Sequence, residues 1–219
     1  GLIDASQRSD AYVVCREDAV LCGSAWFIEV FRQVAPGIKI DWMGSDGDAL
    51  APDQQVCHLH GPARALLTAE RTALNFLQTL SGTASVTARY VNAVAGTGVR
   101  ILDTRKTLPG MRLAQKYAVL AGGGHNHRIG LYDAILIKEN HIEAAGSIAA
   151  AMAQALALKG DTRIEVEIEV ESLVELEQAL DAGAERILLD NFDLNALRVA
   201  VDRNQGRARL EASGGVNMD

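Results

Sequence analysis

The feature that most restricts the possible folds is a pattern that repeats from residue 99 onward. Each repeat has a short apolar run that ends in polar residues, followed by a stretch compatible with a helix. Strands that alternate with helices predict parallel β/α units. In β/α barrels the site is built at the carboxyl ends of the strands, which is where the polar residues of this chain stand. The expected strands are 99–102, 134–137, 164–170, 187–189 and 208–212, and the expected helices are 111–121, 147–158, 173–182 and 194–204.

The segment before residue 63 has a different pattern and predicts a small α+β domain. Strand-like runs at 11–15, 19–22, 38–42 and 55–59 surround one helix-like segment at 25–34. The stretch 47–61 is similar to the sheet of a biotinyl or lipoyl module, but no lysine between residues 44 and 61 could carry such a cofactor. We therefore interpret this stretch as structural.

The predicted organisation is an α+β sandwich domain over residues 1–62 and an α/β barrel-like domain of parallel strands over residues 63–219. Two helices are expected at the start of the larger domain. One opens at Pro62, a favourable first-turn residue, and the other runs from Thr83 to Ala95. A closed barrel needs further strands, so we expect a chain that is incomplete at both ends.

The charge of the chain is unevenly distributed. The formal net charge is −7, yet seven basic and two acidic residues between Arg100 and Lys138 give that window a net charge of +5. A local cationic region in an acidic protein favours a small anionic ligand over a nucleic acid. Three cysteines without a CxxC motif favour a reducing cytoplasm, and no apolar run is long enough for a membrane helix.

Basic residues stand at three places where the pattern turns from an apolar run or a helix to a loop. Thr104-Arg105-Lys106 follows the first run, His127-Arg128 follows three glycines, and Lys138 ends an apolar run. Arginine's planar fork suits carboxylates and phosphates, and lysine offers a compact charge. Each group also has an alternative interpretation: a solvated loop, a helix cap formed by the glycines, and a Schiff-base lysine.

Acidic residues and glycines occupy other strand ends. Four glutamates alternate with apolar residues along 164–171 and so share one face of a strand, as they would also in an exposed antiparallel edge. Asp190 ends the next apolar run, and two carboxylates facing a diphosphate would hold Mg²⁺, mostly through its water molecules. Ser213-Gly214-Gly215 offers backbone N–H groups at the last visible strand end, as phosphate loops of barrels do.

Five segments, taken in order, closely resemble the quinolinate phosphoribosyltransferase family. The resemblance spans residues 47–219 and implies that the chain is an enzyme. It also implies a homodimer whose sites lie between subunits, or a higher oligomer. The implied reaction joins quinolinate to phosphoribosyl pyrophosphate and gives nicotinate mononucleotide, carbon dioxide and pyrophosphate, a step of de novo NAD biosynthesis. The segments are ERTALNFLQTLSG at 70–82, LDTRKTLPG at 102–110, GGGHNHRIGLYDAILIKENH at 122–141, LLDNF at 188–192 and EASGG at 211–215.

The resemblance also implies roles for individual residues. Those expected to bind the quinolinate carboxylates are Arg105, His127 and Arg128. Those expected around the phosphoribosyl pyrophosphate and the substrate are Lys106 and Lys138, and Thr104 is also expected to bind substrate. Those expected at the ribose hydroxyls and the Mg²⁺ ion are Glu169 and Asp190, with Glu167 as the alternative glutamate. Those expected at the 5′-phosphate are Ser213, Gly214 and Gly215. Arg71 would reach into the partner subunit's site, and the implied catalytic residues are Lys138, Lys106, Glu169 and Asp190.

Three other functions stay open on the sequence alone. A paralogue of the same fold, associated with molybdenum transport, shares parts of the DTRKT and HR patterns, although the fuller NHR and IKENH cluster favours quinolinate. A lyase that uses Lys138 as a Schiff base is the second alternative. A phosphate-binding homologue without catalytic activity is the third.

Overall fold

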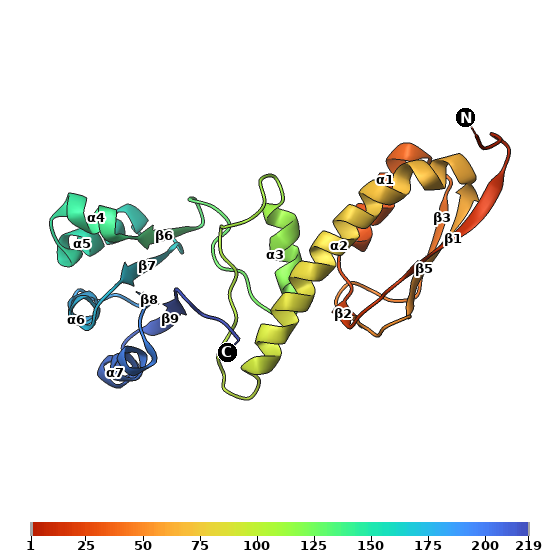
Figure 1. Ribbon diagram of the computed structural model, residues 1–219. Coiled ribbons are helices and arrows are strands. Elements are labelled where there is room, and N and C mark those ends of the chain that lie inside the picture. The colour runs from red at the N-terminus through yellow and green to blue at the C-terminus, as the bar shows by residue number, and fades with distance from the viewer. Residues whose placement is uncertain (1, 219) are drawn as a thin grey trace. The chain divides into compact units, whose positions relative to one another are not determined.

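The computed structural model describes residues 2–218, and the chain folds as two units, the first ending at Ile129 and the second beginning at Gly130. Each unit has its own sheet and its own apolar core (Figure 1). The domain boundary expected after residue 62 stays a prediction.

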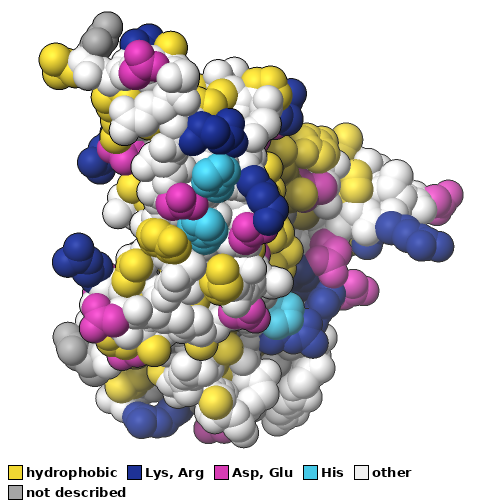
Figure 2. Space-filling model, turned by 90° about the vertical axis from the view of Figure 1, so that its right-hand side faces the viewer, with side chains coloured by type: hydrophobic (Ala, Val, Ile, Leu, Met, Phe, Trp, Pro, Cys, Tyr) yellow, Lys and Arg dark blue, Asp and Glu magenta, His cyan; other side chains and the backbone are white. Residues whose placement is uncertain are grey.

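The first unit begins with a small antiparallel sheet. Its strand order is β1 (Arg8–Val14), β5 (Gln55–Pro62) and β3 (Lys39–Trp42), and β2 (Ala19–Val20) pairs separately with β4 (Ala49–Leu50). Alternate residues of β5 point inward, so Cys57 and Leu59 are buried while His58 and His60 lie on the outer face. Figure 2 views the side of the molecule that lies at the right of Figure 1, and it shows histidine side chains among acidic and basic ones. The expected α+β domain is confirmed, with strand ends shifted by a few residues.

One long helix continues from this sheet. Helix α2 runs without interruption over Ala63–Ala93, and α1 (Ser24–Val34) packs beside it. The sequence-based expectation of two helices here was wrong. Gly82 lies inside α2, where a glycine costs only about 1 kcal/mol relative to alanine. The burial of Leu77, Leu80 and Ala84 on either side of it is enough to keep the helix continuous.

The segment after α2 differs from the expectation as well. Residues 99–102 form no strand; only Leu102 makes an isolated parallel bridge, with His125. The bridge has two backbone hydrogen bonds, from His125 N to Ile101 O and from Asp103 N to His125 O. An apolar run becomes a strand only where a neighbouring strand accompanies it over several residues, and here the partner is a loop. Helix α3 (Arg112–Ala121) follows as expected and packs against α2.

The second unit is a parallel sheet of four strands in the order β6, β7, β8 and β9. The strands are β6 (Ala134–Ile137), β7 (Glu165–Val170), β8 (Arg186–Asp190) and β9 (Arg209–Ser213). Helices α5 (Ile148–Lys159), α6 (Leu173–Asp181) and α7 (Leu194–Asn204) cover one face, where Ile168, Val170 and Ile187 form the core (Figure 1). The predicted β/α alternation is confirmed, and a short helix that was not expected, α4 (Glu139–Ala145), follows β6.

The opposite face of this sheet carries the charged residues. Because side chains alternate along a strand, the two valines and the isoleucine of β7 face the helices while its glutamates face the other way. The glutamates therefore share one face, as expected, but β7 is an inner strand of a parallel sheet and not an exposed edge. In the described part of the chain, no helix combines the length and the apolar character needed to span a membrane.

Candidate active site

Two loops of the first unit carry most of the predicted anion-binding residues. The loop 103–107 and the loop 122–128 lie side by side because of the bridge between Leu102 and His125. The glycines of the second loop have a packing role. A Cβ on Gly122 would lie 2.3 Å from the Ala84 carbonyl oxygen, and one on Gly124 would lie 2.8 Å from side-chain atoms of Thr87 and Val119. These glycines end α3 and allow its loop to approach α2, as the helix-cap interpretation had it.

Asp103 organises both loops from a buried position. Its Oδ1 accepts a hydrogen bond from the His127 backbone N–H at 2.9 Å and also pairs with the Lys116 ammonium group. The Asn126 amide, with its nitrogen toward these oxygens, donates to Asp103 Oδ2 at 2.7 Å and to the Lys116 carbonyl oxygen at 3.0 Å. The side chains of Asp103 and Lys116 are only 7% and 3% exposed, so this ion pair is inside the unit.

Arg105 lies beside these residues in the first loop. Its Nε is buried and has no hydrogen-bond partner among residues 2–218. A buried guanidinium nitrogen without an acceptor is costly, so the site favours an anionic ligand at this position. The two neighbours of Arg105 are exposed, and the Thr104 hydroxyl accepts a hydrogen bond from the Lys106 N–H at 3.0 Å.

The hydrogen bonds of His127 determine which of its ring nitrogens carries the proton. Nδ1 accepts a hydrogen bond from the Arg128 backbone N–H at 2.8 Å, so the proton of a neutral ring lies on Nε2. His127 therefore presents an N–H donor on the side of the ring that faces away from its own backbone, and both His127 and Arg128 are half-buried. Arg71, by contrast, is exposed on α2.

In the second unit, the predicted residues form a row at the carboxyl ends of the strands. Lys138 follows β6, and its ammonium group lies 2.5 Å from a carboxylate oxygen of Glu169 on β7. Asp190 ends β8 and stands opposite Ser213 in the register with β9. All four residues lie on the charged face of the sheet. The structure thus brings together the strand-end residues that the sequence pattern placed at separate strand ends.

The glycines after β9 are required by the backbone. Gly214 has a φ of 82°, and a Cβ there would lie 2.1 Å from the Asn191 side-chain oxygen. Asn191 in turn donates to Asp190 Oδ2 at 2.8 Å and to the Ser213 carbonyl oxygen, through its backbone N–H, at 2.9 Å. Gly215 also has a positive φ, 67°. The loop 213–215 is therefore tied to the carboxylate of the neighbouring strand.

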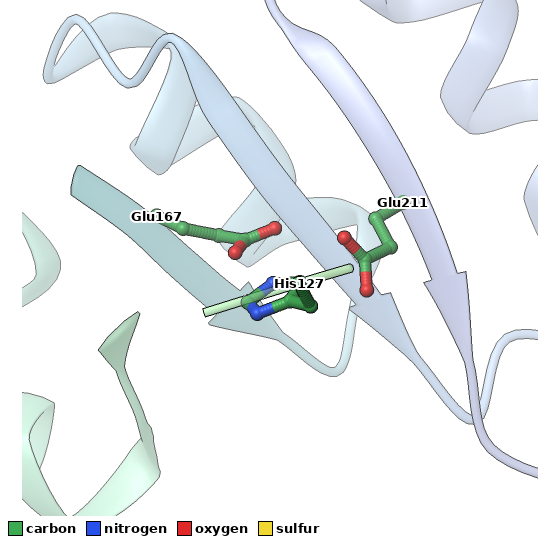
Figure 3. Close-up of side chains that lie close together, drawn as sticks. All are labelled: His127, Glu167 and Glu211. Carbon is green, nitrogen blue, oxygen red and sulfur yellow. The ribbon is translucent and has the colours of Figure 1, made fainter. Parts of the chain in front are cut away.

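A second row of charged side chains lies on the same face of the sheet, closer to the amino ends of the strands. Glu167 on β7 and Glu211 on β9 point toward each other across β8, and carboxylate oxygens of the two lie within 4.8 Å (Figure 3). Arg186 of β8 approaches them at 3.9 Å and 3.7 Å. Glu169, and not Glu167, belongs to the row at the strand ends, beside Lys138. The geometry favours Glu169 as the glutamate of the site.

A cavity of about 200 Å³ opens beside Glu169 in the second unit. Apart from one isoleucine, its lining side chains are carboxylates, which suits a cation better than an anion. The residues that line it are Glu139, Ile142, Glu143, Glu169, Glu171 and Glu175.

Sequence reasoning missed the residues that support the first loops. Asp103, Lys116, Asn126 and Arg112 were not assigned a role. The four-residue spacing of Arg112 and Lys116 places both on one face of α3, but this spacing does not indicate which loop that face contacts. Two of the cysteines are poor nucleophiles, since burial raises the pKa of the Cys22 and Cys57 thiols to about 12.

Comparisons with known proteins agree along the whole chain. A model of the N-terminal domain of quinolinate phosphoribosyl transferase matches residues 2–81, and a model of its C-terminal domain matches residues 83–219. A probable nicotinate-nucleotide pyrophosphorylase (carboxylating) of Bacillus subtilis is 39% identical over 97% of this chain and 73% of its own length. The chloroplastic enzyme of that name from rice is 39% identical over 99% of this chain and 62% of its own length.

Solved structures give the same picture. The nicotinate-nucleotide pyrophosphorylase of Francisella tularensis is 47% identical, with a TM-score of 0.93 over 97% of this chain and 75% of that one. The NadC protein of Streptococcus pyogenes is 43% identical, with a TM-score of 0.93 over 99% of this chain and 76% of that one. This chain thus spans about three quarters of these two structures and less than two thirds of the rice protein.

Proposed function

This chain belongs to the quinolinate phosphoribosyltransferase family, and we propose that it transfers the phosphoribosyl group of phosphoribosyl pyrophosphate to quinolinate. The products are nicotinate mononucleotide, carbon dioxide and pyrophosphate. The observation that carries the proposal is that the matched family models together extend over residues 2–219, within which the two sets of site residues lie. The same observation disfavours a Schiff-base lyase, a non-catalytic homologue and a transport-associated paralogue.

The first unit supplies cations suited to a dianionic pyridine. Arg105 offers a planar fork with a buried Nε that has no partner among the described residues, and His127 carries its proton on Nε2. Arg128 adds a second guanidinium. Two adjacent carboxylates on a ring need this number of donors, because burial of a charge without a partner is costly.

The second unit supplies groups suited to a sugar diphosphate. Lys138 is a compact cation at the end of β6, and Lys106 of the first unit is a second one. The carboxylates of Glu169 and Asp190 suit ribose hydroxyls as hydrogen-bond acceptors. The loop 213–215, with two glycines at positive φ, suits the 5′-phosphate, because consecutive N–H groups in such a backbone form an anion-binding concavity.

Magnesium fits the donor set of the second unit. Glu169 and Asp190 are hard oxygen donors at neighbouring strand ends, and Mg²⁺ is usually held by one or two carboxylates together with substrate phosphates and water. When bound, the ion would neutralise the charge that develops on the leaving pyrophosphate. In the structure the Glu169 carboxylate is paired with Lys138, and the Asp190 carboxylate accepts a hydrogen bond from Asn191.

The reaction follows from these charges. The ring nitrogen of quinolinate attacks the anomeric carbon, the bond from that carbon to the pyrophosphate oxygen breaks, and the pyrophosphate leaves with the electron pair. The lysines stabilise the departing charge. The quaternary nitrogen then stabilises the electrons released when the 2-carboxylate leaves as carbon dioxide, and a proton replaces it on the ring. No covalent enzyme intermediate is needed.

We further propose a homodimer in which Arg71 of one subunit completes the site of the other. The exposed position of Arg71 on α2 supports this, since a donated side chain must be accessible to a partner. A reducing cytoplasm is also proposed. The free thiols at Cys15, Cys22 and Cys57 support it, because an oxidising compartment selects for paired cysteines.

The proposal is tested by carbon dioxide release from carboxyl-labelled quinolinate with phosphoribosyl pyrophosphate and Mg²⁺. We expect release that depends on all three components. Nicotinate, which lacks the 2-carboxylate, serves as the matched control substrate; because it can release no carbon dioxide, formation of nicotinate mononucleotide is measured for both substrates. A site built for two carboxylates leaves its second set of donors unpaired with nicotinate, so we expect turnover to fall by about 10⁴-fold. Comparable turnover of nicotinate would contradict the assignment.

A further inference from the structure

We propose that Lys116 and its partner Asp103 are positioning residues that hold His127 and Arg128 in the geometry required for binding the dicarboxylate. The inference deepens the proposed function and rests on it. Neither residue is exposed enough to meet a substrate directly, as their side chains are 3% and 7% exposed. Their effect must therefore pass through the residues that they contact.

The contacts made by Asp103 and Lys116 reach the two backbone polar groups of His127, its N–H and its carbonyl oxygen. Asp103 Oδ1 accepts from the His127 N–H at 2.9 Å, and Lys116 Nζ donates to the His127 carbonyl oxygen at 3.0 Å. Lys116 and Asp103 are also paired with each other. The backbone of His127 is thus fixed at its donor and at its acceptor by a single buried ion pair.

This fixation extends to the imidazole ring. The Arg128 N–H, the next donor along the chain, bonds to His127 Nδ1 at 2.8 Å and leaves the ring proton on Nε2. If the His127 peptide turned, this bond would break and Nδ1 would lose the donor that it accepts from. The ion pair therefore contributes to which ring nitrogen of His127 is the donor.

Helix α3 anchors the neighbouring residues in the same way. Arg112 lies one turn before Lys116, and its guanidinium donates to the Ile129 carbonyl oxygen at 3.2 Å and to the Arg105 carbonyl oxygen at 3.4 Å. One face of α3 thus carries two cations that bind backbone oxygens in both loops. The helix serves as a rigid support for three residues proposed to contact the dicarboxylate.

A purely structural role does not explain the choice of residues. A buried ion pair is seldom more stabilising than two apolar side chains of similar volume, because the desolvation of both charges offsets their attraction. An apolar pair would fill the same space under α3. It would not hold the His127 N–H and carbonyl oxygen, and this is the property that the site uses.

The test compares three variants. Lys116→Met alone leaves a buried carboxylate unpaired and is expected to unfold readily. The double variant Asp103→Leu/Lys116→Met removes both charges and is expected to fold with a Tm close to that of the wild type. The matched control is Lys39→Met, which breaks an exposed lysine–aspartate pair (Lys39–Asp41, 3.0 Å) in the same unit.

For the double variant we expect the KM for quinolinate to rise on the order of 100-fold, the effect of misplacing a binding group by about 1 Å. The KM for phosphoribosyl pyrophosphate should change little, and Lys39→Met should leave both constants unchanged. Nitrogen NMR of His127 should show the Nε2–H tautomer in the wild type and a mixture in the double variant. A folded double variant with unchanged quinolinate KM and unchanged tautomer would overturn the inference. If the wild type does not use quinolinate, the proposed function fails while the NMR result still decides the positioning role.

Discussion

At the scale of single residues, the chemistry of Lys138 is decided by its neighbour. The Lys138 side chain donates to the Glu169 carboxylate at 2.5 Å, a geometry that suits a charged ammonium group. An ammonium nitrogen has no lone pair for attack on a carbonyl carbon. The contact therefore supports a role for Lys138 in stabilising negative charge at the end of β6 and not the formation of a Schiff base.

Lys138→Ala should accordingly lower activity by about 2–4 kcal/mol of transition-state stabilisation, the usual effect of removing a preorganised charge. Borohydride added with quinolinate and phosphoribosyl pyrophosphate should leave no adduct on Lys138, as judged by mass spectrometry of its peptide. Lys159→Ala, at the end of α5, is the control for loss of a lysine. A reduced adduct at Lys138 would move the protein to the lyases.

The outer face of the first sheet offers a pH-dependent contact. Hydrogen bonds from His58 at 2.7 Å and from His60 at 3.1 Å hold the pKa of Asp10 below its usual value of 3.8. Arg8 also contacts His60, and Asp41 and Lys39 flank the pair on β3.

A depressed carboxylate pKa stabilises the fold above the unfolded value and loses this effect as the pH falls through the folded value. The stability difference between wild type and Asp10→Asn should therefore shrink as the pH falls below about 3.8. Urea denaturation at a series of pH values measures it. The side chain is exposed, so the difference will be small, and an increase on acidification would refute the assignment.

Among single residues, the sequence predicted position best for those that end a strand, while their roles in the site stay predictions. Lys138, Asp190 and Ser213 could be placed because each ends an apolar run, and parallel strands bring such ends to one edge. The buried pair of Asp103 and Lys116 could not be foreseen. It depends on how α3 meets a loop 13 residues earlier in the chain, and no local pattern encodes this contact.

At the scale of elements, the long helix α2 shows how packing overrides a local breaker. Gly82 is exposed, and a Cβ at this position would meet no atom within 4 Å. Nothing in the fold requires a glycine here. The expected break after Gly82 was wrong because the apolar stripe of α2 continues past it.

Gly82→Ala should therefore raise the free energy of unfolding by about 0.5–1 kcal/mol, because alanine has less backbone entropy to lose in a helix. Gly122→Ala is the matched contrast. Its Cβ would lie 2.3 Å from the Ala84 carbonyl oxygen, and we expect a loss of about 1–3 kcal/mol from the forced separation of α3 and α2. Urea denaturation of both variants measures the two changes. Destabilisation by Gly82→Ala would show that the glycine has a further role.

Element types followed from periodicity more reliably than element partners did. The four parallel strands and the helices α5, α6 and α7 were predicted within a few residues, because their apolar runs are bounded by turn residues and charges. The run 99–102 has the same local pattern, but its neighbour in the fold is the loop that contains His125, so one bridge is all that forms. Pairing is a tertiary property, and a single run does not reveal it.

At the scale of the whole molecule, the proposed dimer makes a prediction that no single subunit can meet. Arg71 is exposed on α2, and an exposed arginine is usually solvated. If each subunit instead completes its partner's site, Arg71→Ala and Lys138→Ala should each be nearly inactive. In a mixture of the two variants, about half of the dimers are heterodimers by random pairing, and each of these contains one undamaged site out of two. Exchange of subunits should therefore restore about a quarter of wild-type activity.

Native mass spectrometry verifies the exchange of subunits. The control is Arg64→Ala, which removes another exposed arginine of α2 and should stay active alone. Confirmed heterodimers with no gain over the parent variants would show that Arg71 does not act across the interface.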